Sequence, residues 1–267
     1  MAIETTGAPL MLASTTMGTG PLGTILLHGF LGSGKNLRTL AQKWLQRDER
    51  QCFLLPDLLG HGESPALPAN ATLNTMAAAV LQTAADAGIP FPVQIVGHSL
   101  GGRIALACAR VAPERVADVV LLDIGPGPID PQKSESRHVL DVMLRAPAES
   151  TDRREMRAFF LSQGISPALS DWILMNLRQD DGLYRWRIDR RALDALHSTF
   201  TAEDLWPVIE AQEVPVHCAV GERSSYVPHA EAQRLRELGC DVHVLANAGH
   251  YIHVDALEPL LAWLVSL

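Results

Sequence analysis

The sequence predicts an α/β protein whose mainly parallel sheet is covered by helices on both faces and interrupted by one long helical insertion. Short apolar runs alternate with helical patterns over residues 24–124 and again over 214–265, which is typical of this class. Polar residues that are common in active sites follow directly after several of these runs, where parallel strands would end. Between the two stretches, residues 131–197 carry helical patterns and no strand pattern.

The overall composition is that of a globular protein with a sizeable core. The 267 residues suffice for one large domain, or for one domain with an insertion, and 47% of them are hydrophobic. A net charge of −8 leaves no basic excess for phosphates, so we expect no nucleic-acid partner. No apolar run reaches the ~18 residues that a membrane span needs, and the N-terminus lacks the pattern of a secretory signal.

The four cysteines are scattered, mostly within apolar strand or helix patterns, and have no spacing typical of a metal site. They are Cys52, Cys108, Cys218 and Cys240. We interpret them as reduced core residues of a cytoplasmic protein. The sequence therefore predicts neither a metal nor a cofactor.

The first half of the chain is expected to alternate strands with helices. The expected strands are residues 9–13 at the sheet edge and the runs 24–27, 52–57, 94–97 and 117–124. The expected helices are residues 37–46, 73–87 and 103–112. In the first helix Leu40, Ala41 and Trp44 share one face, as packing against a sheet requires. We expect right-handed crossovers, so the carboxyl ends of the strands meet at one edge of the sheet.

The alternation stops at the breaker cluster Gly125-Pro126-Gly127-Pro128. Helical patterns follow at residues 131–145, 151–163, 167–178 and 189–197. We interpret residues 128–205 as a helical cap, and residues 1–127 and 206–267 as the core. The alternative is that these helices merely extend the core. Strands are expected again at 214–221 and 241–245, with helices at 228–238 and 259–265.

The segment Gly97-His98-Ser99-Leu100-Gly101 lies between a strand and a helix, which is the context of a nucleophile elbow. Ser99 is expected on a strained turn that exposes its hydroxyl above the sheet. Gly97 and Gly101 flank it because the crossing strand and helix leave no room for a Cβ atom. The Leu100 N–H at the helix start is then placed to stabilise a developing negative charge.

A serine hydroxyl needs a base within hydrogen-bond reach and an acid that orients the base. In this architecture the chain order is serine, acid, histidine. We assign the base to His250, which follows the last strand; His253 is the alternative, although we expect it at the surface or at a helix start. We assign the acid to Asp123 at a strand end, with Glu222 as the alternative.

Three further groups of residues are expected in or beside the site. The tetrahedral intermediate needs two donors, which we assign to the N–H groups of Leu100 and Phe30. Tyr226, Trp172 and Trp186 are candidates for binding substrate, the tryptophans as part of a cap whose apolar side chains could line an acyl pocket. The loop histidines are expected to brace their loops and to take no part in chemistry; they are His28 and His61.

One competing motif is a phosphate-binding loop. Gly29, Gly34 and Lys35 have its spacing after a strand and before a helix. That motif requires serine or threonine at the next position to hold Mg²⁺, and the residue here is Asn36. We therefore prefer the interpretation in which Ser99 is a nucleophile.

Four motifs together resemble those of the α/β-hydrolase superfamily, over nearly the whole chain. They are His28-Gly29-Phe30, Asp57-Leu58-Leu59-Gly60-His61-Gly62-Glu63-Ser64, Gly97-His98-Ser99-Leu100-Gly101-Gly102 and Gly249-His250. The resemblance implies a mainly parallel sheet of the eight-stranded type, flanked by helices and carrying a helical cap. It is more specific for the fold than for the reaction.

Within the superfamily, Ser224-Ser225-Tyr226-Val227 resembles a loop of small bacterial and mitochondrial serine esterases. In that branch the loop lacks the acid, which lies on the strand after the nucleophile and maps to Asp123. The resemblance implies hydrolysis of short acyl esters or acyl thioesters. The cap departs most from the branch, so the identity of the substrate is not carried over.

The main hypothesis is a serine hydrolase that cleaves small-molecule carboxylic esters or thioesters through an acyl-enzyme, as a monomer or homodimer. Ser99 excludes the dehalogenase and epoxide-hydrolase branches, which need an aspartate nucleophile. A C–C bond hydrolase or a lyase on the same residues is the first alternative, and a receptor-like binding protein the second. Eleven of the 22 Lys and Arg residues lie between Lys133 and Arg191; we expect a solvated surface there, or else contacts with an anionic substrate such as an acyl-CoA.

Overall fold

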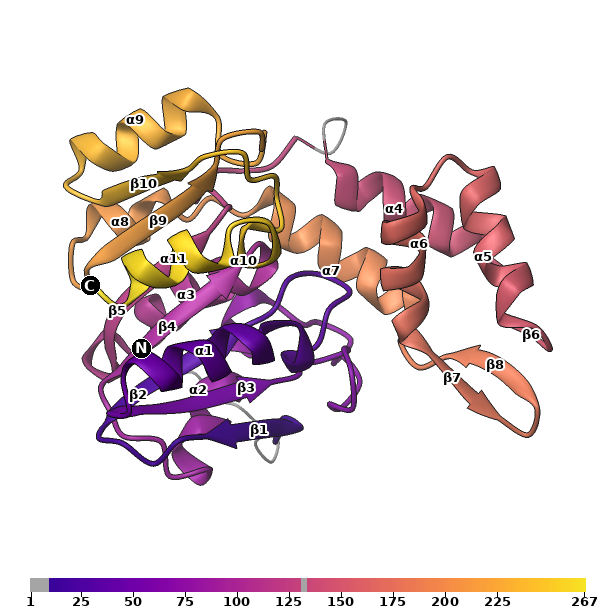
Figure 1. The fold of residues 1–267 in the computed structure, drawn as a ribbon, viewed down its shortest axis with the longest axis horizontal. Coiled ribbons are helices and arrows are strands. Elements are labelled where there is room, and N and C mark those ends of the chain that lie inside the picture. The colour runs from indigo at the N-terminus through magenta and orange to yellow at the C-terminus, as the bar shows by residue number, and fades with distance from the viewer. Residues whose placement is uncertain (1–9, 131–133) are drawn as a thin grey trace.

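The computed structural model describes residues 10–130 and 134–267. A twisted central sheet lies between helices, and a second group of helices, α4 to α7, extends to one side of it (Figure 1). None of the helices in the described ranges is long and apolar enough to cross a membrane.

The central sheet has seven strands within the described part of the chain, in the order β1-β3-β2-β4-β5-β9-β10. Its parallel strands are β2 (Leu22–Leu27), β3 (Gln51–Pro56), β4 (Val93–His98), β5 (Val116–Leu122), β9 (Val216–Gly221) and β10 (Asp241–Leu245). The predicted fold class is confirmed, and the described residues contribute seven strands to the sheet. These runs were predictable because they are buried and nearly continuously apolar.

The edge strand lies later than predicted. We expected it at residues 9–13, whereas β1 is Ser14–Met17 and pairs antiparallel with β3; residue 9 lies outside the described residues. Its mostly exposed Ser-Thr-Thr-Met sequence has no apolar run to signal it. The β-branched threonines nevertheless suit a pleated surface.

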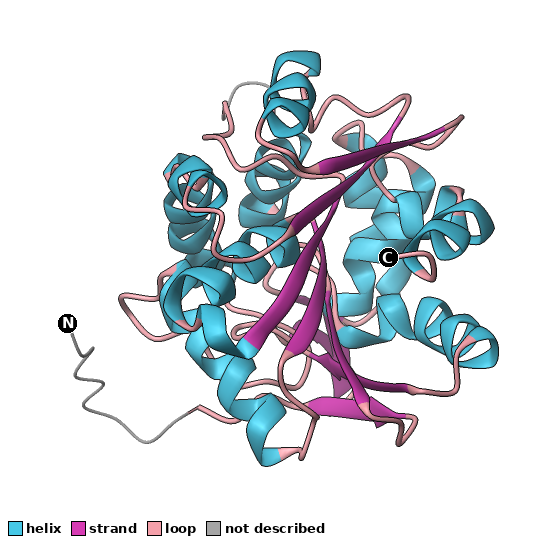
Figure 2. Ribbon diagram, turned by 90° about the vertical axis from the view of Figure 1, so that its left-hand side faces the viewer, coloured by secondary structure: helices cyan, strands magenta, loops and turns pink. Residues whose placement is uncertain are grey.

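Helices cover both faces of the sheet (Figure 2). One face carries α1 (Arg38–Arg47), α10 (Ile252–Asp255) and α11 (Leu257–Leu264). The other carries α2 (Leu73–Asp86), α3 (Leu100–Val111), α8 (Trp206–Glu210) and α9 (His229–Glu237). Successive residues of β4 point to opposite faces of the sheet. Ile95 packs on the face covered by α2, α3, α8 and α9, and Val96 packs on the face covered by α1, α10 and α11.

The insertion contains strands as well as helices, so the prediction of helices alone was wrong. Its helices are α4 (Glu135–Arg145), α5 (Arg153–Ser162), α6 (Pro167–Ile173), η4 (Leu174–Asn176) and α7 (Arg190–Ala202). Its strands β6 (Glu149–Ser150), β7 (Leu177–Asp180) and β8 (Leu183–Trp186) form a small antiparallel sheet. Asp181 and Gly182 join β7 to β8 with positive φ angles of 49° and 76°, which suits a tight hairpin turn.

The insertion begins and ends at one place, beside a buried arginine. Arg103 of α3 donates from Nη1 to the carbonyls of Gly125 (3.1 Å) and Gly127 (2.9 Å), and from Nη2 to the carbonyl of Glu203. The entering and leaving segments also pair directly, because Leu205 N–H donates to the carbonyl of Pro126 at 2.9 Å. The division of the chain at 128 and 205 into core and cap stays a prediction.

Candidate active site

The elbow holds Ser99 in a strained conformation between β4 and α3. Its φ and ψ are 52° and −117°, a region that residues with side chains rarely occupy. A Cβ atom on Gly97 would lie 2.3 Å from the carbonyl carbon and oxygen of Gly101, and one on Gly101 would lie 2.3 Å from the Leu27 carbonyl oxygen. Glycine is therefore the residue that fits at both positions, and Leu100 follows Ser99 as the first residue of α3.

Asp123, at the end of β5, is completely buried and faces His250. The distance from its Oδ2 to His250 Nδ1 is 2.7 Å. The Gly221 N–H donates to Oδ1 at 2.8 Å, and the Ser224 hydroxyl donates to Oδ2. Glu222, the alternative acid, instead accepts the Asn247 N–H at 2.7 Å on the exposed side of its loop. The structure thus brings Asp123 to the histidine and places Glu222 elsewhere.

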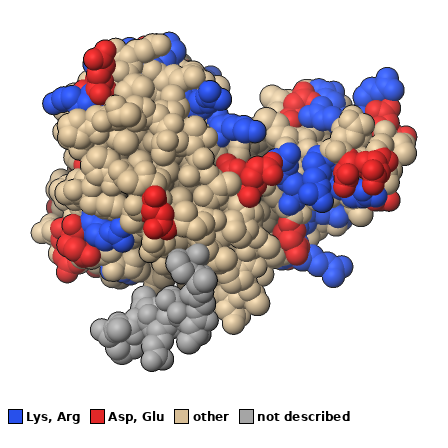
Figure 3. All heavy atoms as spheres, turned by 90° about the horizontal axis from the view of Figure 1, so that it is seen from below, with Lys and Arg blue, Asp and Glu red and all other residues tan. Residues whose placement is uncertain are grey.

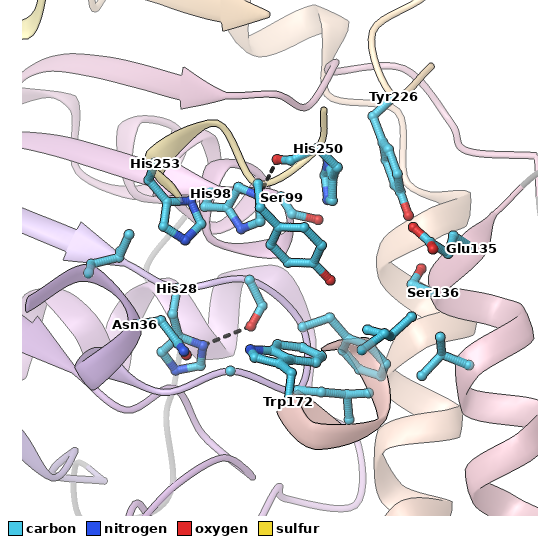
Figure 4. Close-up of a pocket in the computed structure, with 18 residues that line it drawn as sticks. His28, Asn36, His98, Ser99, Glu135, Ser136, Trp172, Tyr226, His250 and His253 are labelled. Carbon is cyan, nitrogen blue, oxygen red and sulfur yellow. Dashed lines mark hydrogen bonds between the residues drawn. The ribbon is translucent and has the colours of Figure 1, made fainter. Parts of the chain in front are cut away.

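His250 and Ser99 line the same pocket (Figure 4). The contact with Asp123 makes Nδ1 of His250 the donor, so Nε2 of the neutral ring is left as an acceptor. An acceptor nitrogen is what a serine hydroxyl needs in order to lose its proton.

The pocket has a volume of about 50 Å³. Phe30, Trp172 and Tyr226 are among its lining residues; their roles as oxyanion donor and substrate contacts stay predictions. Trp186 is not: its Nε1 donates to the carbonyl of Pro147 at 2.9 Å, and its ring packs on Phe160 within the insertion. We therefore withdraw Trp186 as a substrate-binding candidate.

His98, the variable residue of the elbow motif, is bonded to the backbone of His250. Sequence reasoning missed this contact. Its Nε2 donates to the carbonyl of His250 at 2.8 Å. Burial, followed by the nearby His253 and His250, holds the pKa of His98 well below its usual value, so the ring stays neutral and can donate from one nitrogen. No local pattern could signal this bond, because its partners are 152 positions apart.

His253 lies in α10, near its start as expected, but it is buried and not at the surface. Its ring packs on His98 with 4.6 Å between centroids. Burial, followed by the neighbouring His250, lowers the pKa of His253 to about 4. It contacts the ring that supports the proposed base, while His250 itself contacts the acid.

His28 braces the loop after β2, which contains Phe30. It is fully buried, its Nδ1 lies 2.8 Å from the Gly29 carbonyl, and its Nε2 accepts the Leu58 N–H at 2.9 Å. His61, also buried, bonds the Leu59 carbonyl at 3.0 Å. Burial is the main cause that lowers the pKa of His28 to about 3 and of His61 to about 4. Both rings are neutral near pH 7 and hold loops together.

The insertion adds a polar wall to the pocket that sequence reasoning also missed. Glu135 and Ser136 of α4 line the pocket opposite the sheet. Ser136 Oγ lies 2.8 Å from Nε2 of His197, a buried residue of α7. The pocket is therefore closed partly by polar groups and not by apolar side chains alone.

Comparison with known proteins places the chain in a family. A family model described as the alpha/beta hydrolase fold matches residues 25–257. The chain belongs to the α/β-hydrolase family. This α/β-hydrolase is 30% identical over 248 residues to an sn-1-specific diacylglycerol lipase of Xenopus laevis, covering 89% of this chain and 76% of the relative. It is also 30% identical over 241 residues to lipase LipV of Mycobacterium tuberculosis, covering 87% and 88%.

Solved structures agree on the fold of this α/β-hydrolase. A marine microorganism esterase matches with a TM-score of 0.85 and 23% identity, over 96% of this chain and 99% of that one. Both curated relatives are named lipases, which agrees with the expected enzyme class, a hydrolase of the carboxylesterase type.

Proposed function

We propose that this α/β-hydrolase cleaves carboxylic esters or acyl thioesters through an acyl-enzyme, with Ser99, His250 and Asp123 as its triad. The observation that carries the proposal is the 2.7 Å contact between Asp123 and His250 in the pocket that Ser99 lines. The strained elbow supports the role of Ser99, since strain of this kind clusters at functional sites.

The chemistry follows from these positions. His250 Nε2 takes the proton of the Ser99 hydroxyl as its oxygen attacks the acyl carbon, and Asp123 stabilises the imidazolium that forms. The N–H groups of Phe30 and Leu100 stabilise the oxyanion. His250 then protonates the leaving alcohol or thiol, and afterwards activates the water that releases the acid and restores Ser99.

The small pocket favours short acyl groups. A cavity of about 50 Å³ holds only a few non-hydrogen atoms beside Ser99 and His250. We expect kcat/KM for p-nitrophenyl esters to be highest at acetate or butyrate and to fall with octanoate. A rise in kcat/KM up to octanoate would instead indicate that the pocket extends when substrate binds.

The decisive experiment replaces the nucleophile. Ser99→Ala should lower kcat for p-nitrophenyl acetate by ~10³-fold or more, because the triad acts as a unit. Ser198→Ala, an exposed serine of α7, is the matched control and should keep the parent rate. If Ser99→Ala hydrolyses the ester as fast as the parent enzyme, the proposed function is wrong.

The arginines of the insertion do not single out an anionic substrate. Acids lie among them on this part of the surface (Figure 3), and several pairs are direct: Arg137 with Asp141 and Asp194, Arg157 with Asp171, and Arg185 with Glu149. Such exposed pairs are typical of a solvated surface. We therefore expect hydrolysis of an acyl-CoA to show the same salt dependence as hydrolysis of a neutral ester.

A further inference from the structure

The loop after β9 lays a tyrosine ring flat on the proposed base. The ring centroids of Tyr226 and His250 are 3.7 Å apart, and the ring planes differ by 15°. Two other rings beside His250 meet it at an angle: His98 at 43° and Tyr251 at 65°. Among these contacts in the described residues, Tyr226 alone gives the imidazole a parallel π face (Figure 4).

The same short loop also holds the acid. Ser224 donates its hydroxyl proton to Asp123 Oδ2, and its oxygen accepts the Tyr226 N–H at 3.2 Å. The hydroxyl is the donor toward the carboxylate, which can only accept, and its oxygen remains able to accept the N–H. Ser224 and Tyr226 therefore act on the two partners of one hydrogen bond, Asp123 on one side and His250 on the other.

The far end of the tyrosine faces the insertion. Its hydroxyl points toward Glu135 and Ser136 of α4 (Figure 4). Burial, followed by the charge of Glu135, raises the pKa of Tyr226 to about 12, so the hydroxyl keeps its proton. Ser136 in turn lies 2.8 Å from His197 of α7. A row of neighbouring side chains thus runs from α7 through α4 to the face of the imidazole.

We propose that Tyr226 is a positioning residue for His250, beyond a role as a wall of the substrate pocket. Its stacked ring keeps the imidazole aligned between Asp123 and Ser99, and it stabilises the imidazolium by a cation–π contact during acyl transfer. Its hydroxyl end is directed at Glu135 and Ser136, so the ring also meets the insertion. This inference rests on the proposed triad.

Kinetics separate positioning from substrate binding. Tyr226→Met and Tyr226→Leu remove the ring, and each should lower kcat for p-nitrophenyl acetate by ~10-fold, which corresponds to a typical cation–π contact in a desolvated site. KM should change less than about twofold, since a positioning residue acts mainly on the chemical step. Tyr226→Phe keeps the stack and should retain most of kcat.

A spectroscopic readout reports the alignment directly. The low-field proton resonance of the His250 Nδ1–H, bonded to Asp123, should persist in Tyr226→Phe and should broaden or vanish in Tyr226→Met. Tyr184→Leu, in the distant strand β8, is the matched control for loss of a half-buried tyrosine and should leave both kcat and this resonance unchanged.

The outcomes distinguish this inference from the function on which it rests. An inactive Ser99→Ala enzyme together with a Tyr226→Met enzyme of parent kcat overturns the positioning role alone. A raised KM with unchanged kcat in Tyr226→Met also overturns it and makes Tyr226 a substrate contact. An active Ser99→Ala enzyme overturns the triad itself. Because two ring-free variants are measured, a folding failure of one leaves the other to decide.

Discussion

Ser99 and Asp123 both hold a backbone conformation that residues with a Cβ atom rarely adopt. Their φ angles are 52° and 55°, and Leu31 in the oxyanion loop has 62°. Each such residue costs on the order of 1–3 kcal/mol and persists only where its surroundings impose it. Three of the six residues with side chains and positive φ in the described part of the chain therefore lie where the proposed chemistry needs an exposed hydroxyl, a buried carboxylate and N–H donors.

The choice between the two candidate acids can be tested directly. Asp123→Asn keeps the shape of the side chain but favours the wrong tautomer of His250, so kcat should fall by ~10³- to 10⁴-fold. Glu222→Gln should stay within about twofold of the parent, because Glu222 contacts the backbone of Asn247 and not the histidine. Equal losses in the two variants would contradict the assignment of Asp123.

The elbow glycines can be tested against a glycine elsewhere. Gly97→Ala should destabilise the protein by at least ~3 kcal/mol, because its Cβ would lie 2.3 Å from the Gly101 backbone. Gly88, unlike Gly97, has a positive φ, of 70°, but nothing lies within 4 Å of its Cβ position. Gly88→Ala should therefore cost only ~1–2 kcal/mol. Urea unfolding followed by tryptophan fluorescence measures both, and a loss in Gly97→Ala no larger than that in Gly88→Ala would contradict crowding as the reason for the elbow glycine.

Among the elements, α3 both follows Ser99 and holds the two ends of the insertion. Arg103, on its first turn, is fully buried and bonds three carbonyls at the two ends of the insertion. Burial is the main cause that lowers the pKa of Arg103 to about 10, which still leaves it charged at neutral pH. The helix that begins with Leu100, a proposed oxyanion donor, therefore also anchors the insertion.

Replacing this arginine should weaken the whole molecule. Arg103→Met fills similar space but leaves the carbonyls of Gly125, Gly127 and Glu203 without a donor, so we expect a loss of ~3–5 kcal/mol in the free energy of unfolding. Arg154→Ala, an exposed arginine of α5, is the control and should leave that free energy unchanged within error. An unchanged free energy of unfolding in Arg103→Met would mean that the direct pairing of the segments that enter and leave the insertion is enough to hold its two ends together.

Buried, regular elements were predictable from the sequence, whereas short and half-exposed ones were not. β4 and β5, which Ser99 and Asp123 follow, were predicted to within two residues at each end because their apolar runs are buried on both faces. The hairpin of β7 and β8 was missed because its residues are mostly exposed or half-buried. His98 and Tyr226 act through partners far along the chain, so their contacts could not be predicted from local pattern.

Across the whole molecule, five histidines are buried: His28, His61, His98, His197 and His253. Burial is the main cause that lowers their pKa values, to about 3 for His28, to about 4 for His61, His197 and His253, and well below normal for His98. The unfolded chain binds protons at these rings near pH 6.5, while the folded protein does not bind them until about pH 4 or below. Stability is therefore full above pH 6.5 and is lost as the pH falls toward 4.

Urea unfolding at pH 7.5, 6.5, 5.5 and 5.0 measures this loss. Each buried histidine contributes a slope of up to ~1.4 kcal/mol per pH unit in that window. His61→Asn should reduce the slope by up to this amount, whereas His138→Ala, at an exposed position of α4, should leave it unchanged. A free energy of unfolding that stays constant from pH 7.5 to 5.0 would contradict neutral burial of these rings.

The two ends of the insertion meet beside Arg103, where Leu205 pairs with Pro126 and Ile129 with Thr201. A segment whose ends are neighbours can lengthen, shorten or be exchanged while the flanking chain keeps its path. Mutation can then reshape the wall that meets the acyl group without disturbing the sheet ends that carry Ser99 and Asp123. The same junction is a suitable boundary for a chimera that joins the insertion of one family member to the central sheet and flanking helices of another.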